Sequence, residues 1–205
     1  MKIDELLKTV DNNSKYTVKF YVGDYSSRQK AANVDKAICY VEHHFNSSDA
    51  DDPTAADYSV VITGRNASKK SISWAKQYSD LINDEFLEIK RVGGADGVLV
   101  GGYGGRGDGN LILTNMPAIL VEPMFCNDPE HAVVIKSADG QKRLAKVLAY
   151  TIKNNFPNGG LVAFSVGHKY KKSAPNDRGA VVYGGGTEAD CSEQVLLFCK
   201  QLLEL

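Results

Sequence analysis

Short apolar segments that alternate with helical segments along most of the chain are the feature that most constrains its fold. Residues 16–22 place Val18, Phe20 and Val22 against polar neighbours, which is the period of a half-buried strand. Further strand-like runs occur at residues 37–41, 58–63, 118–121 and 161–164, and helical spacing occurs at residues 5–10, 27–35, 69–86, 140–154 and 187–205. This order predicts an α/β fold, a three-layer α/β/α domain with a mainly parallel twisted sheet of about six strands and helices on both faces.

The size and charge of the chain narrow the classes of protein to which it can belong. Its 205 residues are enough for a full hydrophobic core, and we assign residues 1–205 to a single domain. The net charge is −1, so the basic excess of a nucleic-acid-binding protein is missing. No stretch comes near the roughly 20 apolar residues that span a bilayer, so no membrane partner is expected. Residues 1–5 read Met-Lys-Ile-Asp-Glu and do not resemble a secretory signal, so synthesis in the cytoplasm without one is expected.

The chain has four cysteines, Cys39, Cys126, Cys191 and Cys199. None of them belongs to a Cys-x-x-Cys pair, so a thiolate zinc site is not expected. Their apolar or helical surroundings predict buried thiols in the reduced form.

Four side chains are candidates for a metal site. His44, Glu122 and His168 each lie just beyond a strand-like run, and Glu188 begins the last predicted helix. Ligand sites in open α/β sheets form beyond the carboxyl ends of the strands, so residues far apart in sequence can meet there. Two histidines and one glutamate are a known catalytic zinc set, and a further carboxylate can take a proton from water. This pattern suggests a metal bound by His44, His168 and Glu188, with Glu122 as the base.

Each candidate also has a structural interpretation, and spacing alone leaves both open. A first-turn glutamate such as Glu188 is often a helix-dipole partner, and an acid after an apolar strand, such as Glu122, is commonly ion-paired. His43 precedes His44 on the same strand, so its side chain is expected on the opposite face in a supporting or structural role. His131 follows an expected helix start at Asp128-Pro129 and is expected to be solvated.

Residues 114–127, Thr-Asn-Met-Pro-Ala-Ile-Leu-Val-Glu-Pro-Met-Phe-Cys-Asn, resemble the signature block of the Amidase_3 zinc amidases, in which the strand ends in the catalytic glutamate. Arg28, Ala32-Asn33 and His44-Phe45-Asn46 resemble the segment of that family that supplies a zinc histidine. Gly167-His168, residues 177–181 and Thr187-Glu188 resemble the elements with which the family normally begins. Because these last elements come at the end of this chain, we expect a circularly permuted amidase topology.

Two segments of the chain depart from the family pattern. The motif Asp-Pro-Gly-His-Gly-Gly of the family reads Ser-Val-Gly-His-Lys-Tyr at residues 165–170. The small residue that usually stands before the second histidine is replaced around Glu42. Both departures leave the expected ligands in place.

The resemblance implies an N-acetylmuramoyl-L-alanine amidase that cuts bacterial peptidoglycan with one Zn²⁺ per chain. His44, His168 and Glu188 would bind the ion, Glu122 would be the catalytic base, and Asn46 and Asn127 would hold backbone or neighbouring groups. The segments 93–110, expected to be a long loop, and 169–172 are expected to line the substrate groove.

The same resemblance leaves several alternatives open. A zinc peptidase acting within the stem peptide would share the site, and a non-catalytic wall-binding protein would keep the fold. The expected partner is peptidoglycan, without a separate cell-wall-binding domain; a monomer is favoured, although the sequence leaves the oligomeric state open. The lack of a recognisable signal fits a phage or prophage endolysin that reaches the wall after holin-mediated release.

Overall fold

The computed structural model describes residues 3–10, 15–48, 58–87 and 97–205. The helices are α1 (Ile3–Leu7), α2 (Tyr25–Val34), α3 (Lys69–Glu85), the 3-10 helix η1 (Asp108–Asn110), α4 (Pro129–Lys136), α5 (Ala138–Asn155) and α6 (Glu188–Glu204). The strands are β1 (Tyr16–Phe20), β2 (Cys39–His43), β3 (Val60–Thr63), β4 (Val98–Val100), β5 (Ala118–Glu122) and β6 (Gly160–Val166).

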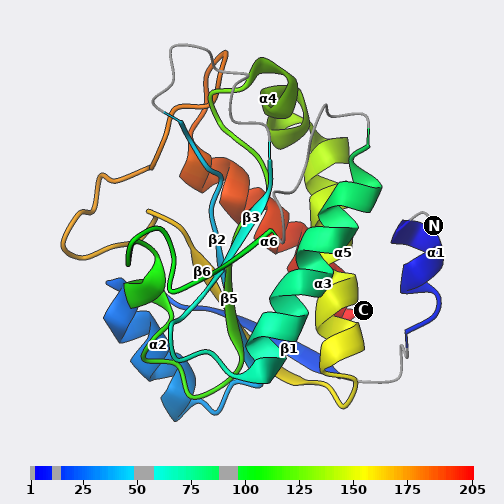
Figure 1. Ribbon diagram of the computed structural model, residues 1–205, viewed down its shortest axis with the longest axis vertical. Coiled ribbons are helices and arrows are strands. Elements are labelled where there is room, and N and C mark those ends of the chain that lie inside the picture. The colour runs from blue at the N-terminus through cyan, green and yellow to red at the C-terminus, as the bar shows by residue number, and fades with distance from the viewer. Residues whose placement is uncertain (1–2, 11–14, 49–57, 88–96) are drawn as a thin grey trace.

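These strands form one sheet in the order β1-β6-β2-β5-β3-β4 (Figure 1). The neighbours β1, β6, β2 and β5 are mutually parallel, whereas β3 runs antiparallel to β5 and parallel to β4. The sheet is therefore mixed but mostly parallel. Because β2, β5 and β6 are parallel neighbours, their carboxyl ends meet at one edge of the sheet.

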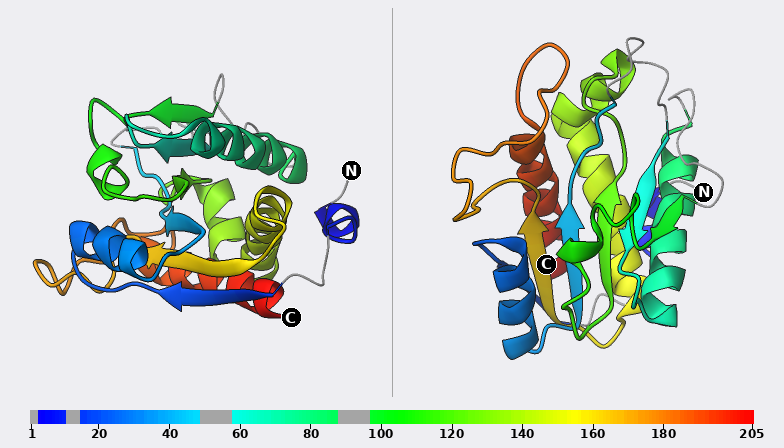
Figure 2. Two further views of the ribbon diagram at one scale, coloured as in Figure 1. Left: turned by 90° about the horizontal axis from the view of Figure 1, so that it is seen from below. Right: turned by 60° about the vertical axis from the view of Figure 1, so that its left-hand side comes forward.

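Helices cover the two faces of this sheet unequally (Figure 2). The larger apolar cluster lies between the sheet and α3, α5 and α6, and contains Val41 and Ile119. The smaller cluster lies on the opposite face under α2 and η1, and contains Tyr40 and Leu120. Successive residues of one strand thus point to opposite layers, as the strand period requires. The predicted three-layer α/β fold is confirmed.

Capping residues set the starts of the later helices. Asp128 Oδ1 accepts hydrogen bonds from the backbone N–H groups of Glu130 and His131, at 2.7 and 2.9 Å, with Pro129 in the first turn. Thr187 caps α6 in the same manner, through the N–H of Asp190. The predicted helix starts at Asp128-Pro129 and at Thr187 are confirmed.

The remaining sequence predictions have mixed outcomes. All four cysteines are free and buried, which confirms the predicted reduced thiols. Part of the predicted loop 93–110, residues 93–96, lies outside the described residues. Within the described ranges, no helix combines the length and the apolar character that crossing a bilayer requires.

Candidate metal centre

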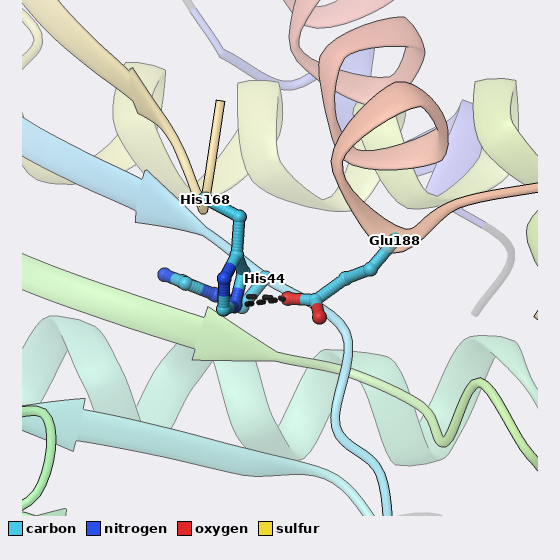
Figure 3. Close-up of side chains that lie close together, drawn as sticks. All are labelled: His44, His168 and Glu188. Atoms are coloured by element: carbon cyan, nitrogen blue, oxygen red, sulfur yellow. Dashed lines mark hydrogen bonds and ion pairs between the residues drawn. The ribbon is translucent and has the colours of Figure 1, made fainter. Parts of the chain in front are cut away.

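The strand ends bring the candidate side chains to one place. His44 directly follows β2, Glu122 is the last residue of β5, and His168 follows β6 after Gly167. Glu188 is the first residue of α6, whose amino-terminal end reaches the same edge of the sheet (Figure 3). The side chains of His44, His168 and Glu188 point toward one another, as Figure 3 shows.

The geometry of these three side chains suits a single ion. Nδ1 of His44 lies 2.8 Å from Oε1 of Glu188, and Nε2 of His168 lies 3.4 Å from the same oxygen. One ligand atom from each residue lies within 4.8 Å of the other two. His44 and Glu188 are buried, and His168 is partly exposed. Two imidazoles and one carboxylate with an open side match the donor set of catalytic zinc sites.

Charge interactions hold this cluster together. Burial lowers the pKa of His44, but its hydrogen bonds to Glu188 and Glu42 outweigh burial and raise that pKa to about 10. Burial raises the pKa of Glu188, but the hydrogen bond and charge of His44, the charge of His168 and the backbone N–H of Ala180 together outweigh it. The net shift of this pKa is downward. The two groups therefore attract each other as imidazolium and carboxylate when no ion is bound.

Glu122 faces the same cavity as the three potential ligands. This cavity has a volume of about 360 Å³, and Glu122, His44, His168 and Glu188 all line it. Burial is the largest cause of the raised pKa of Glu122. Its Oε2 atom is buried and has no hydrogen-bond partner among the described residues. A buried carboxylate oxygen without a partner is suited to exchange a proton with a bound water or substrate.

The two asparagines have different surroundings. Asn46 lines the cavity, and its Nδ2 donates to the hydroxyl of Tyr103 at 3.3 Å. Asn127 does not line the cavity; its side chain binds Ser48 instead, accepting from the backbone N–H at 3.1 Å and donating to the carbonyl and the hydroxyl. Asn127 thus fastens the segment that follows β2.

Two glycines allow the close approach of the potential ligands. A Cβ atom on Gly167 would lie 2.4 Å from the ring of His44. Gly179 has φ +69°, and a Cβ there would lie 2.3 Å from Oε2 of Glu188 and 2.7 Å from Cδ2 of His168. His168 itself has φ +61°, which is uncommon for a residue other than glycine. The site therefore depends on a particular backbone path as well as on its side chains.

The sequence analysis missed two carboxylates that contact the histidines. Glu42 Oε1 lies 2.9 Å from Nε2 of His44, and Asp177 Oδ1 lies 2.9 Å from Nδ1 of His168. Each imidazole therefore has a carboxylate on the nitrogen that faces away from the shared oxygen of Glu188. A charged residue inside the apolar run of β2 was the only signal for Glu42. The resemblance of residues 177–181 to the family marked the segment of Asp177 but not the contact of Asp177 with His168.

The other two histidines lie outside this cluster. His43 is fully buried next to Ser192, at 3.2 Å, and burial together with the charge of His44 lowers its pKa to about 3. Its structural interpretation agrees with this location. The prediction that His131 is solvated is wrong: its side chain is buried, and its Nδ1 accepts from the backbone N–H of Phe125 at 3.0 Å. It closes the turn after β5 from the first turn of α4.

Comparison with known proteins shows a family to which this chain is similar. The family model described as N-acetylmuramoyl-L-alanine amidase, Amidase_3, matches residues 4–154 of the 205. No curated protein sequence matches the chain.

Two solved structures share the fold. The N-acetylmuramoyl-L-alanine amidase from Clostridium difficile 630 superposes with a TM-score of 0.51 at 20% identity, over 65% of this chain and 66% of that one. The catalytic domain of CwlV, an N-acetylmuramoyl-L-alanine amidase from Bacillus (Paenibacillus) polymyxa var. colistinus, gives 0.50 at 21% identity, over 65% and 66%. The chain thus spans just under two thirds of these two structures. The family match covers well over half of the sequence, and the chain therefore belongs to the Amidase_3 family of N-acetylmuramoyl-L-alanine amidases.

Proposed function

We propose that this protein hydrolyses the amide bond between N-acetylmuramic acid and L-alanine in bacterial peptidoglycan. His44, His168 and Glu188 would hold one Zn²⁺ ion. The observation that carries the proposal is the convergence of these three side chains beside Glu122 in one cavity, in a chain of the amidase family. The fit of the ion rests on the donor set and on the unpartnered Oε2 of Glu122.

The chemistry divides between the ion and Glu122. A bound zinc ion supplies Lewis acidity toward the carbonyl oxygen and toward water. Glu122 takes a proton from the attacking water as the new C–O bond forms at the carbonyl carbon. It then gives this proton to the nitrogen of L-alanine as the C–N bond breaks. The raised pKa of Glu122 lies closer to neutral pH than that of an exposed glutamate, which suits a group that both takes and gives a proton.

Cationic and aromatic side chains around the cavity support a peptide substrate. Arg106 and Lys171 line it together with Tyr25 and Tyr103. The stem peptide of peptidoglycan carries carboxylates, and the two cations provide complementary charge. Arg106 and Lys171 belong to the segments 93–110 and 169–172 that we expect to form the groove.

A digest of purified sacculi tests the proposal. The wild type should release peptides that begin with the free amine of L-alanine and should leave glycan strands with intact lactyl groups, as read by mass spectrometry. Glu122→Gln should lower the rate about 10²- to 10⁴-fold, because the proton can no longer be carried. Glu130→Gln, the same change at an exposed site on α4, should leave the rate unchanged.

The products separate the amidase from its alternatives. New amines within the stem peptide would identify a peptidase, and binding to sacculi without any release would identify a wall-binding protein. Equal rates for the wild type and Glu122→Gln would remove the assigned base.

We also propose that residues 1–205 form one domain of circularly permuted topology. The family match ends at residue 154, and the segment after it supplies β6, His168 and α6. The strand of this late segment, β6, is an interior strand of the sheet, because it pairs with both β1 and β2. Phage origin and release through a holin stay predictions.

A further inference from the structure

Glu42 of β2 is a fully buried carboxylate that accepts hydrogen bonds from several directions. Its Oε1 lies 2.9 Å from Nε2 of His44 and 2.6 Å from Nδ2 of Asn110. Its Oε2 lies 3.0 Å from the hydroxyl of Ser165 and 3.3 Å from the hydroxyl of Tyr40. Four partners on two oxygens satisfy a carboxylate that solvent cannot reach.

The direction of these bonds is set by Arg28, which is itself buried. Its Nη1 atom donates to the hydroxyl oxygen of Ser165 at 2.7 Å and to the carbonyl of Val166 at 2.7 Å. A guanidinium can only donate, so the hydroxyl of Ser165 accepts from Arg28 and directs its own hydrogen to Glu42. The amide nitrogen of Asn110 can also only donate. Ser165 and Asn110 are therefore both donors toward the oxygens of Glu42.

This carboxylate determines which nitrogen of His44 can bind an ion. When a metal ion displaces the other ring proton, an acceptor at Nε2 keeps the remaining hydrogen on that nitrogen. Nδ1 then presents its lone pair on the opposite side of the ring, where Glu188 and His168 lie. We propose that Glu42 is a positioning residue that fixes the ring and the tautomer of His44 for metal binding. This inference rests on the proposed metal site and goes beyond it, since Glu42 touches neither ion nor substrate.

The strand register connects this role to the sequence. Glu42 and Ser165 are partners across β2 and β6. Both positions are among the departures of the chain from the family pattern, with serine in place of aspartate and glutamate in place of a small residue. The structure joins both departures in one hydrogen-bonded pair. The carboxylate beside the histidine site thus lies on β2 in this chain, and the hydroxyl lies on β6.

Zinc affinity tests the role of Glu42 without reference to catalysis. The zinc dissociation constant is measured at equilibrium by competition with a chromophoric chelator. Glu42→Gln keeps the volume of the side chain but sets an NH₂ group against at least one donor, and it should weaken zinc binding by about 10- to 100-fold. Glu85→Gln, which removes a carboxylate bound to Arg143 Nε at 2.8 Å on the far side of the core, should leave the affinity unchanged.

Moving the carboxylate from position 42 to position 165 tests whether lost zinc affinity can be restored. Glu42→Ser alone should bind zinc weakly, and adding Ser165→Asp should restore most of the lost affinity by returning a carboxylate to the neighbouring strand. In the zinc-loaded wild type, NMR should show the ring hydrogen of His44 on Nε2. If Glu42 only stabilised the fold, Ser165→Asp would not restore the zinc affinity, and the ring hydrogen of His44 would not be fixed on Nε2.

The outcomes are distinct. A folded Glu42→Gln variant that binds zinc within about twofold of the wild type overturns the inference while leaving the proposed function intact. If Glu42→Gln does not fold, a folded exchange variant that binds no better than Glu42→Ser overturns it in the same way. Wild type that binds no zinc overturns the proposed metal site and this inference together.

Discussion

The ring of His44 lies between the carboxylates of Glu42 and Glu188, and their hydrogen bonds outweigh burial to raise its pKa to about 10. Without an ion, the ring is therefore protonated at pH 7. Zinc binds the neutral ring, so binding must release this proton. We expect release of about one proton per ion at pH 7, and an affinity that falls about tenfold for each pH unit of acidification below the pKa of His44.

Isothermal titration calorimetry measures this release. Zinc is titrated into chelator-treated protein at pH 7 in two buffers of different ionisation enthalpy, and the difference in heat gives the number of protons. A small chelator of known proton release, titrated in the same buffers, serves as the control. Equal heats in both buffers, together with equal affinities at pH 6.5 and 7.5, would contradict the raised pKa.

The sequence predicted some residues of the site and missed others. Resemblance to the family placed His44, His168, Glu188 and Glu122 in one cluster, because their motifs are local and short. It missed Glu42, since its partners come from the chain at Asn110 and Ser165, and no local pattern records such contacts. The side chain of a helix-start residue is commonly solvated, but the chain before α4 turns back over His131 and buries it.

Between elements, Gly179 links the loop after β6 to the start of α6. Its φ of +69° is costly for any residue with a Cβ, and a Cβ would contact the carboxylate of Glu188 and the ring of His168. We expect Gly179→Ala to displace one of these side chains and to weaken zinc binding at least about tenfold, in addition to a loss of about 1 kcal/mol or more in the free energy of unfolding. A zinc titration and urea unfolding measure the two effects.

Gly185→Ala is the matched control for this change. Gly185 also has a positive φ, +100°, but a Cβ there would meet nothing within 4 Å. It should lose stability through backbone strain alone and should keep the zinc affinity of the wild type. Equal affinities for Gly179→Ala and the wild type would contradict the close approach seen at Gly179.

The elements themselves were largely predictable, and the direction of the strands only in part. Alternation in residues 16–22 and the apolar run at 118–121 correspond to β1 and β5, because side-chain period depends on local burial. The antiparallel direction of β3 was not predicted, since periodicity is the same for both directions of a strand. Pairing partners depend on contacts between distant segments.

At the scale of the whole molecule, the order of the elements can be tested by moving the ends of the chain. A variant that begins at Asn158, with residues 205 and 1 joined through a Gly/Ser linker, starts with β6 and keeps every strand intact. We expect it to fold and to bind zinc with the affinity of the wild type, because β6 and α6 pack in the same core as the segment 4–154. Circular dichroism and the chelator competition measure both properties.

A control uses the same linker with the opening between Leu120 and Val121, inside β5. This variant should not fold, because both residues are buried in the central part of the sheet. Failure of the Asn158 variant alone to fold would contradict the proposed permuted topology.

The ring of His44 is already held on both sides by carboxylates, and Arg28 ties the backbone beside His168 through the carbonyl of Lys169. Contacts within the protein therefore hold these groups in place, without a contribution from the metal ion. We accordingly expect these side chains to keep their positions when zinc is removed, so that the ion can bind again without refolding of the chain.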